Sequence, residues 1–232
     1  PGPLEVLDVY PAEAENAPVQ FYIHGGYWRA QDKSDVSFLA EPFTAAGACV
    51  VIINYDLCPN ASLPEIMAET VRALIWTREN IAEWGGDPEQ IFISGNSAGA
   101  HLGAMLLARD WAADGQPDDI IKGAALLTGV YDPTPVMGIT VNDAVRLTPD
   151  MIGAVSPMLN LPRRDLPLLV PVGGAETTEW IKQTRAYVDL CQANGINAQF
   201  MDVPGADHFD MTAAMGDEAG PVLPAILQQM GL

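Results

Sequence analysis

One short segment combines residue types that could make a nucleophile. Residues 91–101 spell IFISGNSAGAH: an apolar run, a Gly-x-Ser-x-Gly turn, and then small residues typical of the start of a helix. A tight turn from strand to helix requires small residues around the serine, and Gly95, Ala98 and Gly99 meet that need. Such a turn lifts the serine hydroxyl clear of the sheet. We therefore predict that Ser97 is a catalytic nucleophile.

Ser97 needs a general base to take its proton, and the chain has three histidines. His208 follows the last strand-like run, and the loop after the last strand carries the base in folds with this kind of nucleophile turn. His101 lies four residues after Ser97 on the expected helix, so we expect it to take part in helix packing. His24 opens a glycine-rich loop that it could hold by hydrogen bonds. We predict that His208 is the base.

A carboxylate must orient the imidazole, and four acidic residues are candidates. Glu176 is the first carboxylate after the apolar run 167–172, and it fits the chain order serine, acid, histidine. Glu179 is one helical turn further on, Asp132 follows the preceding strand-like run, and Asp207 adjoins the base. We choose Glu176, because Glu179 suits a solvated helix surface and neighbours in sequence rarely face each other correctly.

A second glycine-rich segment could stabilise the oxyanion that the nucleophile creates. Residues 24–28 (HGGYW) directly follow an apolar run, and two adjacent glycines let the backbone approach a ligand closely. The backbone N–H groups of Gly26 and Tyr27, together with that of Ala98 after the nucleophile, are the expected oxyanion donors, with Gly25 as close support.

Two aromatic side chains of the same loop are candidates for substrate binding. Tyr27 and Trp28 could line a flat pocket that holds an aromatic or amide substrate. For Trp28, packing in the core is an equal alternative.

Strand-like and helix-like runs alternate along the chain. The expected strands are 19–23, 49–53, 90–93, 123–128, 167–172 and 198–203, and the expected helices are 34–46, 63–84, 98–111, 176–194 and 219–230. This alternation predicts an α/β fold, a mostly parallel sheet with helices on both faces, in which ligands bind beyond the carboxyl ends of the strands. Each candidate group falls at such an end. With the nucleophile turn, the order of elements predicts the α/β-hydrolase fold.

The domain organisation is expected to be simple. A length of 232 residues suits one domain with a large core, and the sequence contains no repeat and no low-complexity segment. We therefore predict a single domain over residues 1–232. Segment 131–161 lies between two strand-like runs and is rich in Pro, Met and Thr. We expect it to overhang the active site.

Composition restricts the partners. A net charge of −19 argues against nucleic acid and against an anionic membrane surface. The sequence has no apolar run long enough to cross a bilayer and no secretory leader at its start. Cys49, Cys58 and Cys191 follow no metal-binding spacing, so we expect no metal and no cofactor. The expected setting is the cytoplasm and the expected partner a small-molecule substrate, with a homodimer left open.

Four motifs resemble the kynurenine formamidases, or arylformamidases, of the α/β-hydrolase superfamily. They are HGGYW at 24–28, YDLCP at 55–59, GNSAGAHL at 95–102 and DHF at 207–209, and their spacing extends the resemblance over most of the chain. The resemblance implies a serine hydrolase that removes the formyl group from N-formylkynurenine, without a metal, using Ser97, Glu176 and His208. That family usually has aspartate at the acid position. A carboxylesterase or amidase acting on other small acyl substrates is the alternative.

Overall fold

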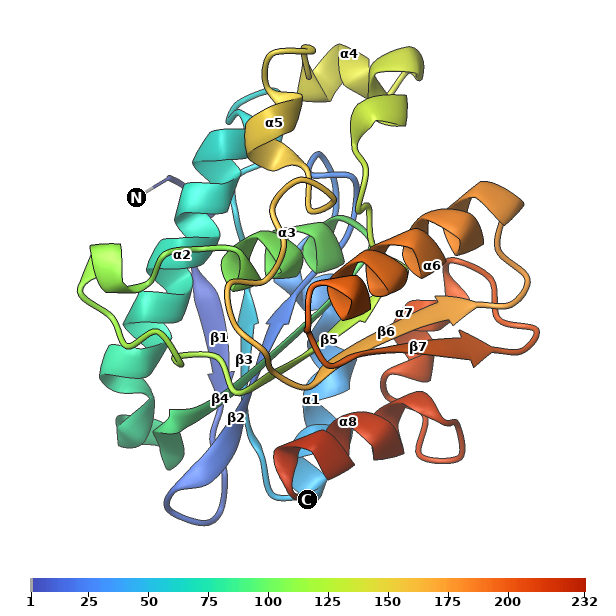
Figure 1. Cartoon of the computed structure of the whole chain (residues 1–232). Coiled ribbons are helices and arrows are strands. Elements are labelled where there is room, and N and C mark those ends of the chain that lie inside the picture. The colour runs from blue at the N-terminus through green and yellow to red at the C-terminus, as the bar shows by residue number, and fades with distance from the viewer. Residues whose placement is uncertain (1) are drawn as a thin grey trace.

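Seven strands form one sheet in the computed structural model, which describes residues 2–232 (Figure 1). The strands are β1 (Leu7–Tyr10), β2 (Ala17–Ile23), β3 (Cys49–Ile53), β4 (Gly86–Asn96), β5 (Gly123–Leu127), β6 (Leu168–Gly173) and β7 (Ala198–Val203). Their order in space is β1-β3-β2-β4-β5-β6-β7, with β1 antiparallel to β3 and the other neighbours parallel. The carboxyl ends of six strands therefore share one edge, where ligands bind in sheets of this type.

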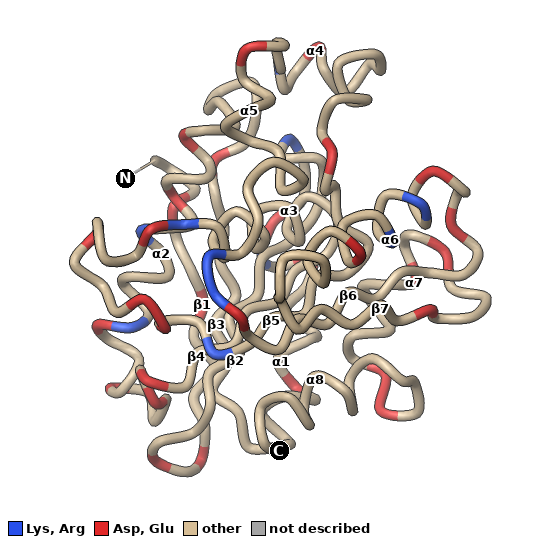
Figure 2. The backbone as a smooth tube through the Cα atoms, in the orientation of Figure 1, with Lys and Arg blue, Asp and Glu red and all other residues tan. Residues whose placement is uncertain are grey.

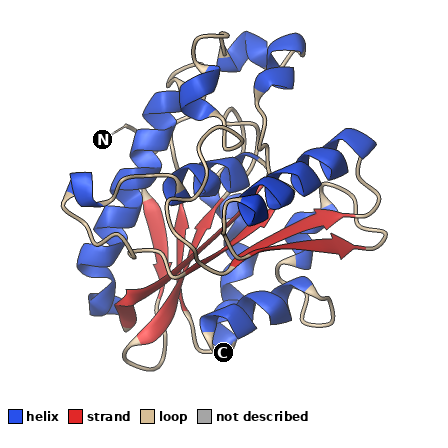
Figure 3. Cartoon of the chain, viewed as in Figure 1, coloured by secondary structure: helices blue, strands red, loops and turns tan. Residues whose placement is uncertain are grey.

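Helices cover both faces of the sheet (Figure 3). The helices are α1 (Ala40–Ala45), α2 (Leu63–Asn80), α3 (Ala98–Leu107), α4 (Asn142–Val145), α5 (Ile152–Val155), α6 (Thr178–Ala193), α7 (Asp210–Ala214) and α8 (Val222–Met230). Apolar side chains of α2, α3 and α6 belong to the core on one face, and those of α1, α7 and α8 belong to the core on the other. This arrangement confirms the predicted fold class.

The central strands show why the sequence specifies two cores. In β3, Val51 and Ile53 pack into one core, while Val50 and Ile52 pack into the other. Successive side chains of a strand point to opposite faces, so a strand covered on both sides needs apolar residues at every position. The near-continuous apolar runs of the sequence satisfy this requirement.

Some elements differ from those predicted. Strand β1 was not expected, because four half-buried residues at the edge of a sheet make no apolar run. The predicted helix 34–46 is a 3₁₀ helix (Lys33–Leu39) followed by α1. Pro42 has no N–H to donate to the preceding turn, which separates the two pieces. The predicted helix 63–84 is α2 followed by a 3₁₀ helix (Ile81–Trp84), and the predicted helix 98–111 ends at Leu107.

Segment 131–161 contains a 3₁₀ helix (Thr134–Gly138), α4 and α5, which lie at the top of Figure 1. It packs against α3, where the Val155 carbonyl lies 2.7 Å from Nε2 of His101. Its predicted overhang of the active site stays a prediction, as does the single domain. The predicted domain includes residue 1, which lies outside the described residues.

The acidic residues are spread around the whole fold (Figure 2). The three cysteines are buried free thiols, as a small apolar side chain permits. Across residues 2–232, the structure has no helix that is both long and apolar enough to cross a membrane.

Candidate active site

The nucleophile turn places Ser97 between the end of β4 and the start of α3. Its backbone has φ 55° and ψ −117°, a combination that non-glycine residues seldom adopt. The Ser97 N–H donates to the carbonyl of Leu127 at the end of β5, over 2.9 Å. Holding such a residue costs on the order of 1–3 kcal/mol, and strain of this kind is concentrated at functional sites.

The two glycines of the motif are required by close backbone contacts. A Cβ atom on Gly99 would lie 2.0 Å from the carbonyl oxygen of Ile23, at the end of β2. A Cβ atom on Gly95 would lie 2.6 Å from the carbonyl carbon of Gly99. The helix therefore packs directly onto the strand ends, which the sequence predicted from the need for small residues.

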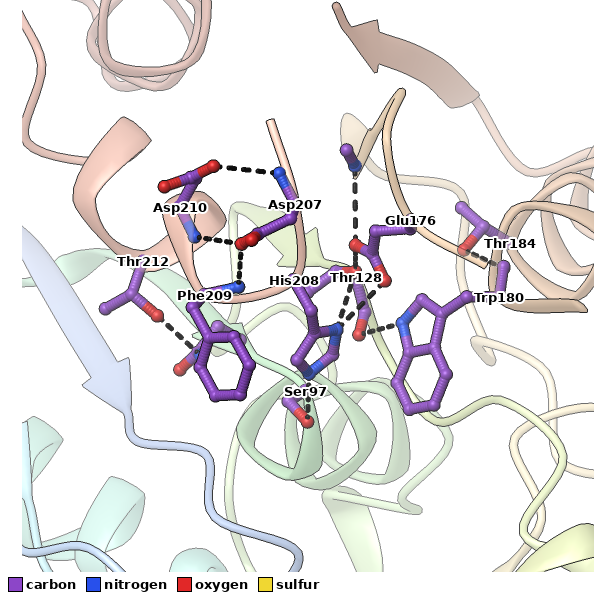
Figure 4. A network of polar contacts seen from close by, with 12 residues as sticks. Ser97, Thr128, Glu176, Trp180, Thr184, Asp207, His208, Phe209, Asp210 and Thr212 are labelled. Carbon is purple, nitrogen blue, oxygen red and sulfur yellow. Dashed lines mark hydrogen bonds and ion pairs between the residues drawn. The ribbon is translucent and has the colours of Figure 1, made fainter. Parts of the chain in front are cut away.

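The structure brings Ser97, His208 and Glu176 into one hydrogen-bonded chain (Figure 4). Oγ of Ser97 lies 3.0 Å from Nε2 of His208, and Nδ1 of His208 lies 2.9 Å from Oε2 of Glu176. With the proton on Nδ1 donated to the carboxylate, Nε2 is free to accept the serine proton. The Glu176 side chain is 2% exposed and that of His208 is 27% exposed, so the imidazole is open to a ligand while the carboxylate is shielded.

The other acidic candidates have different partners. Asp132 accepts the backbone N–H of Thr134 at 2.9 Å, and Asp207 accepts those of the two turn residues Phe209 and Asp210 at 2.8 and 3.0 Å. Glu179 forms an exposed ion pair with Lys182. Among the four candidates, Glu176 is the one that meets the imidazole.

Thr128, which the sequence reasoning did not single out, joins the same network. Its hydroxyl donates to Oε1 of Glu176 and lies 3.3 Å from Nδ1 of His208. Its side chain is fully buried, and its φ of 48° is unusual for a β-branched residue. The sequence placed Thr128 at the carboxyl end of an expected strand, which is the edge of the sheet where the site lies. A threonine at a strand end is too common to stand out further.

The loop after β2 has an unusual backbone. Gly26, Tyr27 and Trp28 have φ values of 96°, 50° and 56°, three consecutive residues in the left-handed region. A Cβ atom on Gly26 would lie 2.2 Å from the carbonyl of Ala30, so the loop closes tightly there. In the part of the chain that the structure describes, no hydrogen bond uses the N–H groups of Gly25, Gly26, Tyr27 or Ala98. The predicted oxyanion donors are thus available to a ligand, and their role stays a prediction.

Buried side chains fix this loop from behind. The hydroxyl of Tyr55 donates to the carbonyls of His24 and Gly25 at 2.8 and 3.0 Å. The His24 ring stacks on Tyr55, with ring centres 4.3 Å apart, and its Nδ1 lies 2.9 Å from the Gly25 carbonyl. Burial lowers the pKa of His24, so a neutral ring donates that bond. His24 therefore has the supporting role that the sequence suggested.

Trp28 corrects one prediction. Its side chain is fully buried in the core, so it does not line a substrate pocket in this structure. Its indole N–H donates to Nδ1 of His101 at 3.2 Å. The left-handed backbone turns consecutive side chains in different directions, which explains why Tyr27 is partly exposed while its neighbour is buried.

His101 connects the loop, the elbow helix and segment 131–161. Burial lowers its pKa to about 4, so the ring is neutral near neutral pH. Its Nε2–H then donates to the Val155 carbonyl, and Nδ1 accepts the Trp28 indole N–H. This residue packs within the fold, in agreement with the structural role expected for it.

A pocket of about 300 Å³ opens beside His208. Aromatic rings surround the imidazole: Trp180 meets it edge-on with ring centres 4.6 Å apart, and Phe209 does so at 6.0 Å. The Tyr27 ring lies 6.3 Å from that of Trp180. The lining residues are Tyr27, Ala175, Glu176, Thr177, Trp180, Asp207, His208 and Phe209. Sequence reasoning named Tyr27 but missed Trp180, four residues after Glu176, and Phe209, directly after His208.

Comparisons with known proteins agree with this geometry. Residues 20–212 match the family model described as alpha/beta hydrolase fold. The kynurenine formamidase of Danio rerio is 30% identical over 235 residues, which cover 98% of this chain and 78% of the relative. Esterase LipQ of Mycobacterium tuberculosis is 32% identical over 88% of this chain and 53% of its own length.

Solved structures give the same fold. A thermostable esterase from Pseudomonas putida superposes with a TM-score of 0.78 at 22% identity, covering 97% of this chain and 76% of the esterase. The chain is therefore a member of the α/β-hydrolase family and a hydrolase, similar in sequence to kynurenine formamidases and esterases.

Proposed function

We propose that this hydrolase cleaves aryl formamides such as N-formylkynurenine to formate and the free aromatic amine, through an acyl-serine intermediate. One observation carries the proposal. Ser97, His208 and Glu176 form a hydrogen-bonded chain, and His208 and Glu176 of that chain line a pocket that aromatic rings surround. The formamidase relatives, similar over nearly the whole chain, point to the same substrate class.

The proposed reaction follows from this arrangement. His208 takes the proton of Ser97 as the serine oxygen attacks the formyl carbon, and the N–H groups of Gly26, Tyr27 and Ala98 stabilise the negative oxygen. His208 then gives its proton to the amine nitrogen as the C–N bond breaks. Water, deprotonated by His208, attacks the formyl-serine, and formate leaves as the proton returns to Ser97.

The pocket favours an aromatic leaving group. A cavity of about 300 Å³ lies at the small end of the range for small-molecule sites, and one aromatic ring with short substituents suits it. The rings of Trp180 and Phe209 stand nearly perpendicular to the imidazole of the proposed base, where the leaving amine must receive its proton. Offset or edge-on contact between aromatic rings stabilises a complex beyond the area that it buries.

A carboxylesterase or amidase acting on other small acyl compounds is the second candidate. Esterase LipQ is as similar in sequence as the formamidases are, over most of this chain. The same nucleophile, base and oxyanion donors would serve an ester, so the leaving group and the acyl group decide between the two.

Steady-state kinetics separates the candidates. We expect kcat/KM for N-formylkynurenine to exceed that for p-nitrophenyl acetate by at least about 10-fold, although the ester is intrinsically more reactive. The N-acetyl analogue of the formamide should react more slowly than the formyl compound. An enzyme that turns over the ester but not the formamide would support the second candidate and reject the first.

A further inference from the structure

The hydroxyl of Thr128 contacts the carboxylate of Glu176 beside the proposed catalytic residues. The glutamate side chain has three rotatable bonds, so its carboxylate can adopt many orientations. Something must hold it against the imidazole. Thr128 lies directly after β5, and β5 is the strand between β4 and β6. Ser97 follows β4, and Glu176 follows β6.

The carboxylate of Glu176 is held at both oxygens. Oε2 receives the imidazole Nδ1–H at 2.9 Å. Oε1 receives the hydroxyl of Thr128 and, at 3.4 Å, the N–H of Gly173. A carboxylate bonded through both oxygens cannot rotate about its last bond without losing a partner, and bonds to a charged group are the stronger kind.

Two hydrogen bonds hold the backbone of Thr128. Its N–H donates to the carbonyl of Pro171 at 2.8 Å, and its carbonyl accepts the indole N–H of Trp180 at 2.8 Å. The φ of 48° places a fully buried, β-branched residue in the left-handed region, where it persists only because its surroundings over-determine it. Backbone strain at a residue whose hydroxyl meets the orienting acid points to a functional constraint.

We infer that Thr128 is a positioning residue, whose hydroxyl holds the Glu176 carboxylate in the orientation that directs His208 toward Ser97. It acts through the glutamate and touches no substrate. Figure 4 shows the threonine, the carboxylate and the imidazole facing one another. This inference rests on the proposed serine-hydrolase chemistry, but it does not depend on which acyl compound is the substrate.

The central test is Thr128→Val, which removes the hydroxyl and keeps the size and branching at Cβ. With p-nitrophenyl acetate as the probe, we expect kcat to fall about 10- to 100-fold while KM changes less than about 3-fold, as the loss of a hydrogen bond to a charged group implies. Thr128→Ser should keep kcat within about 3-fold of the original, and Thr128→Ala should behave like the valine variant. The Ser and Ala variants differ by the hydroxyl alone, so their kcat values can be compared instead if the valine variant fails to fold.

Thr77→Val is the matched control. Thr77 is equally buried on α2, and its hydroxyl bonds only the Ala73 carbonyl of its own helix, so kcat should not change. Urea unfolding of each variant checks that folding is intact. The inference would be overturned if folded Thr128→Val had the kcat of the original chain, or if Thr128→Ser and Thr128→Ala had the same kcat as each other.

A double-mutant cycle tests whether the hydroxyl acts through the glutamate. Glu176→Ala removes the carboxylate that the Thr128 hydroxyl contacts. In that background, Thr128→Val should cost less than about 2-fold in the rate of fluorophosphonate labelling, compared with a large loss in the original chain. An equal loss in both backgrounds would contradict it. Full turnover in Ser97→Ala would overturn the proposed chemistry together with this inference. If Ser97→Ala loses turnover but Thr128→Val keeps the kcat of the original chain, this inference alone is overturned.

Discussion

Phe209 shows how a single exposed side chain can matter at the residue scale. It follows the base directly and is 84% exposed, although it lines the pocket. An aromatic ring left in water next to an active site gains contacts when a ligand arrives. This suits a binding role better than a structural one.

Replacing Phe209 by alanine should therefore weaken binding without weakening the fold. We expect KM for N-formylkynurenine to rise about 3- to 10-fold, from the loss of aromatic contact. Turnover of ethyl acetate, which has no ring, should stay constant. The free energy of unfolding should change by less than about 0.5 kcal/mol, as at other exposed sites. Phe38→Ala, at another exposed phenylalanine, is the control; equal effects of both variants on KM would contradict the binding role.

At the scale of elements, α3 connects the nucleophile to the rest of the site. It begins directly after the strained Ser97, contacts β2 through Gly99 and carries His101, which joins Trp28 of the loop after β2 to Val155 of segment 131–161. These contacts require the imidazole to be neutral, since its Nδ1 accepts a hydrogen bond. The position of the loop thus depends on a ring that must stay unprotonated.

The stability of these contacts should depend on pH in a predictable direction. Burial lowers the pKa of His101 to about 4, against about 6.5 in an unfolded chain. Between these pH values the unfolded chain binds more protons at this residue than the folded chain does. The contribution of His101 to the free energy of unfolding is therefore complete above about pH 6.5 and is lost as the pH falls toward 4. We expect a loss of about 2 kcal/mol in the free energy of unfolding between about pH 7 and pH 5 from this residue.

Urea unfolding at the two pH values, in the original chain and in His101→Gln, measures this contribution. The glutamine amide can still donate to the Val155 carbonyl but does not titrate in this range. The pH-dependent loss should be smaller in the variant, with a remainder from groups such as His24, whose pKa is also lowered. The same loss in both proteins would show that His101 is not the source.

At the scale of the whole molecule, the parallel sheet brings the site together. Ser97 and His208 are 111 residues apart in sequence and Glu176 and His208 are 32 apart, yet all three lie at the carboxyl edge of the strands. The sheet fixes the strand ends on a common line, so the short loops that follow them can bring their side chains into contact.

Much of this arrangement was predictable from the sequence, and the exceptions have physical reasons. Strand β3 has the predicted bounds, because an apolar run between turn residues defines a buried strand clearly. Strand β7 also has the predicted bounds, although it is a half-exposed edge strand that contains Gln199 and Asp202. The edge strand β1 was missed because it is short and half-buried. The direction of Trp28 and the contact of Thr128 were not predictable, since both depend on left-handed backbone conformations that the residue types do not suggest.

The net charge of −19 is also a property of the whole chain, and it should appear in the salt dependence of stability. Repulsion among acidic groups spread around the fold opposes the compact state, and salt screens it. We expect the Tm to rise by about 2–4 °C between about 0.02 M and 0.3 M NaCl at pH near 7. KCl should act equally, as screening requires. A Tm that falls or stays constant would indicate that the favourable ion pairs outweigh the repulsion.

The most direct test of the active site is labelling by a fluorophosphonate, followed by mass spectrometry of the peptides. The proposed active site predicts one adduct per chain, located on Ser97, that forms in step with the loss of esterase activity. The adduct should be absent in Ser97→Ala and should form much more slowly in His208→Gln. An unlabelled Ser97 in a fully active enzyme, or activity that survives complete labelling of Ser97, would contradict this prediction.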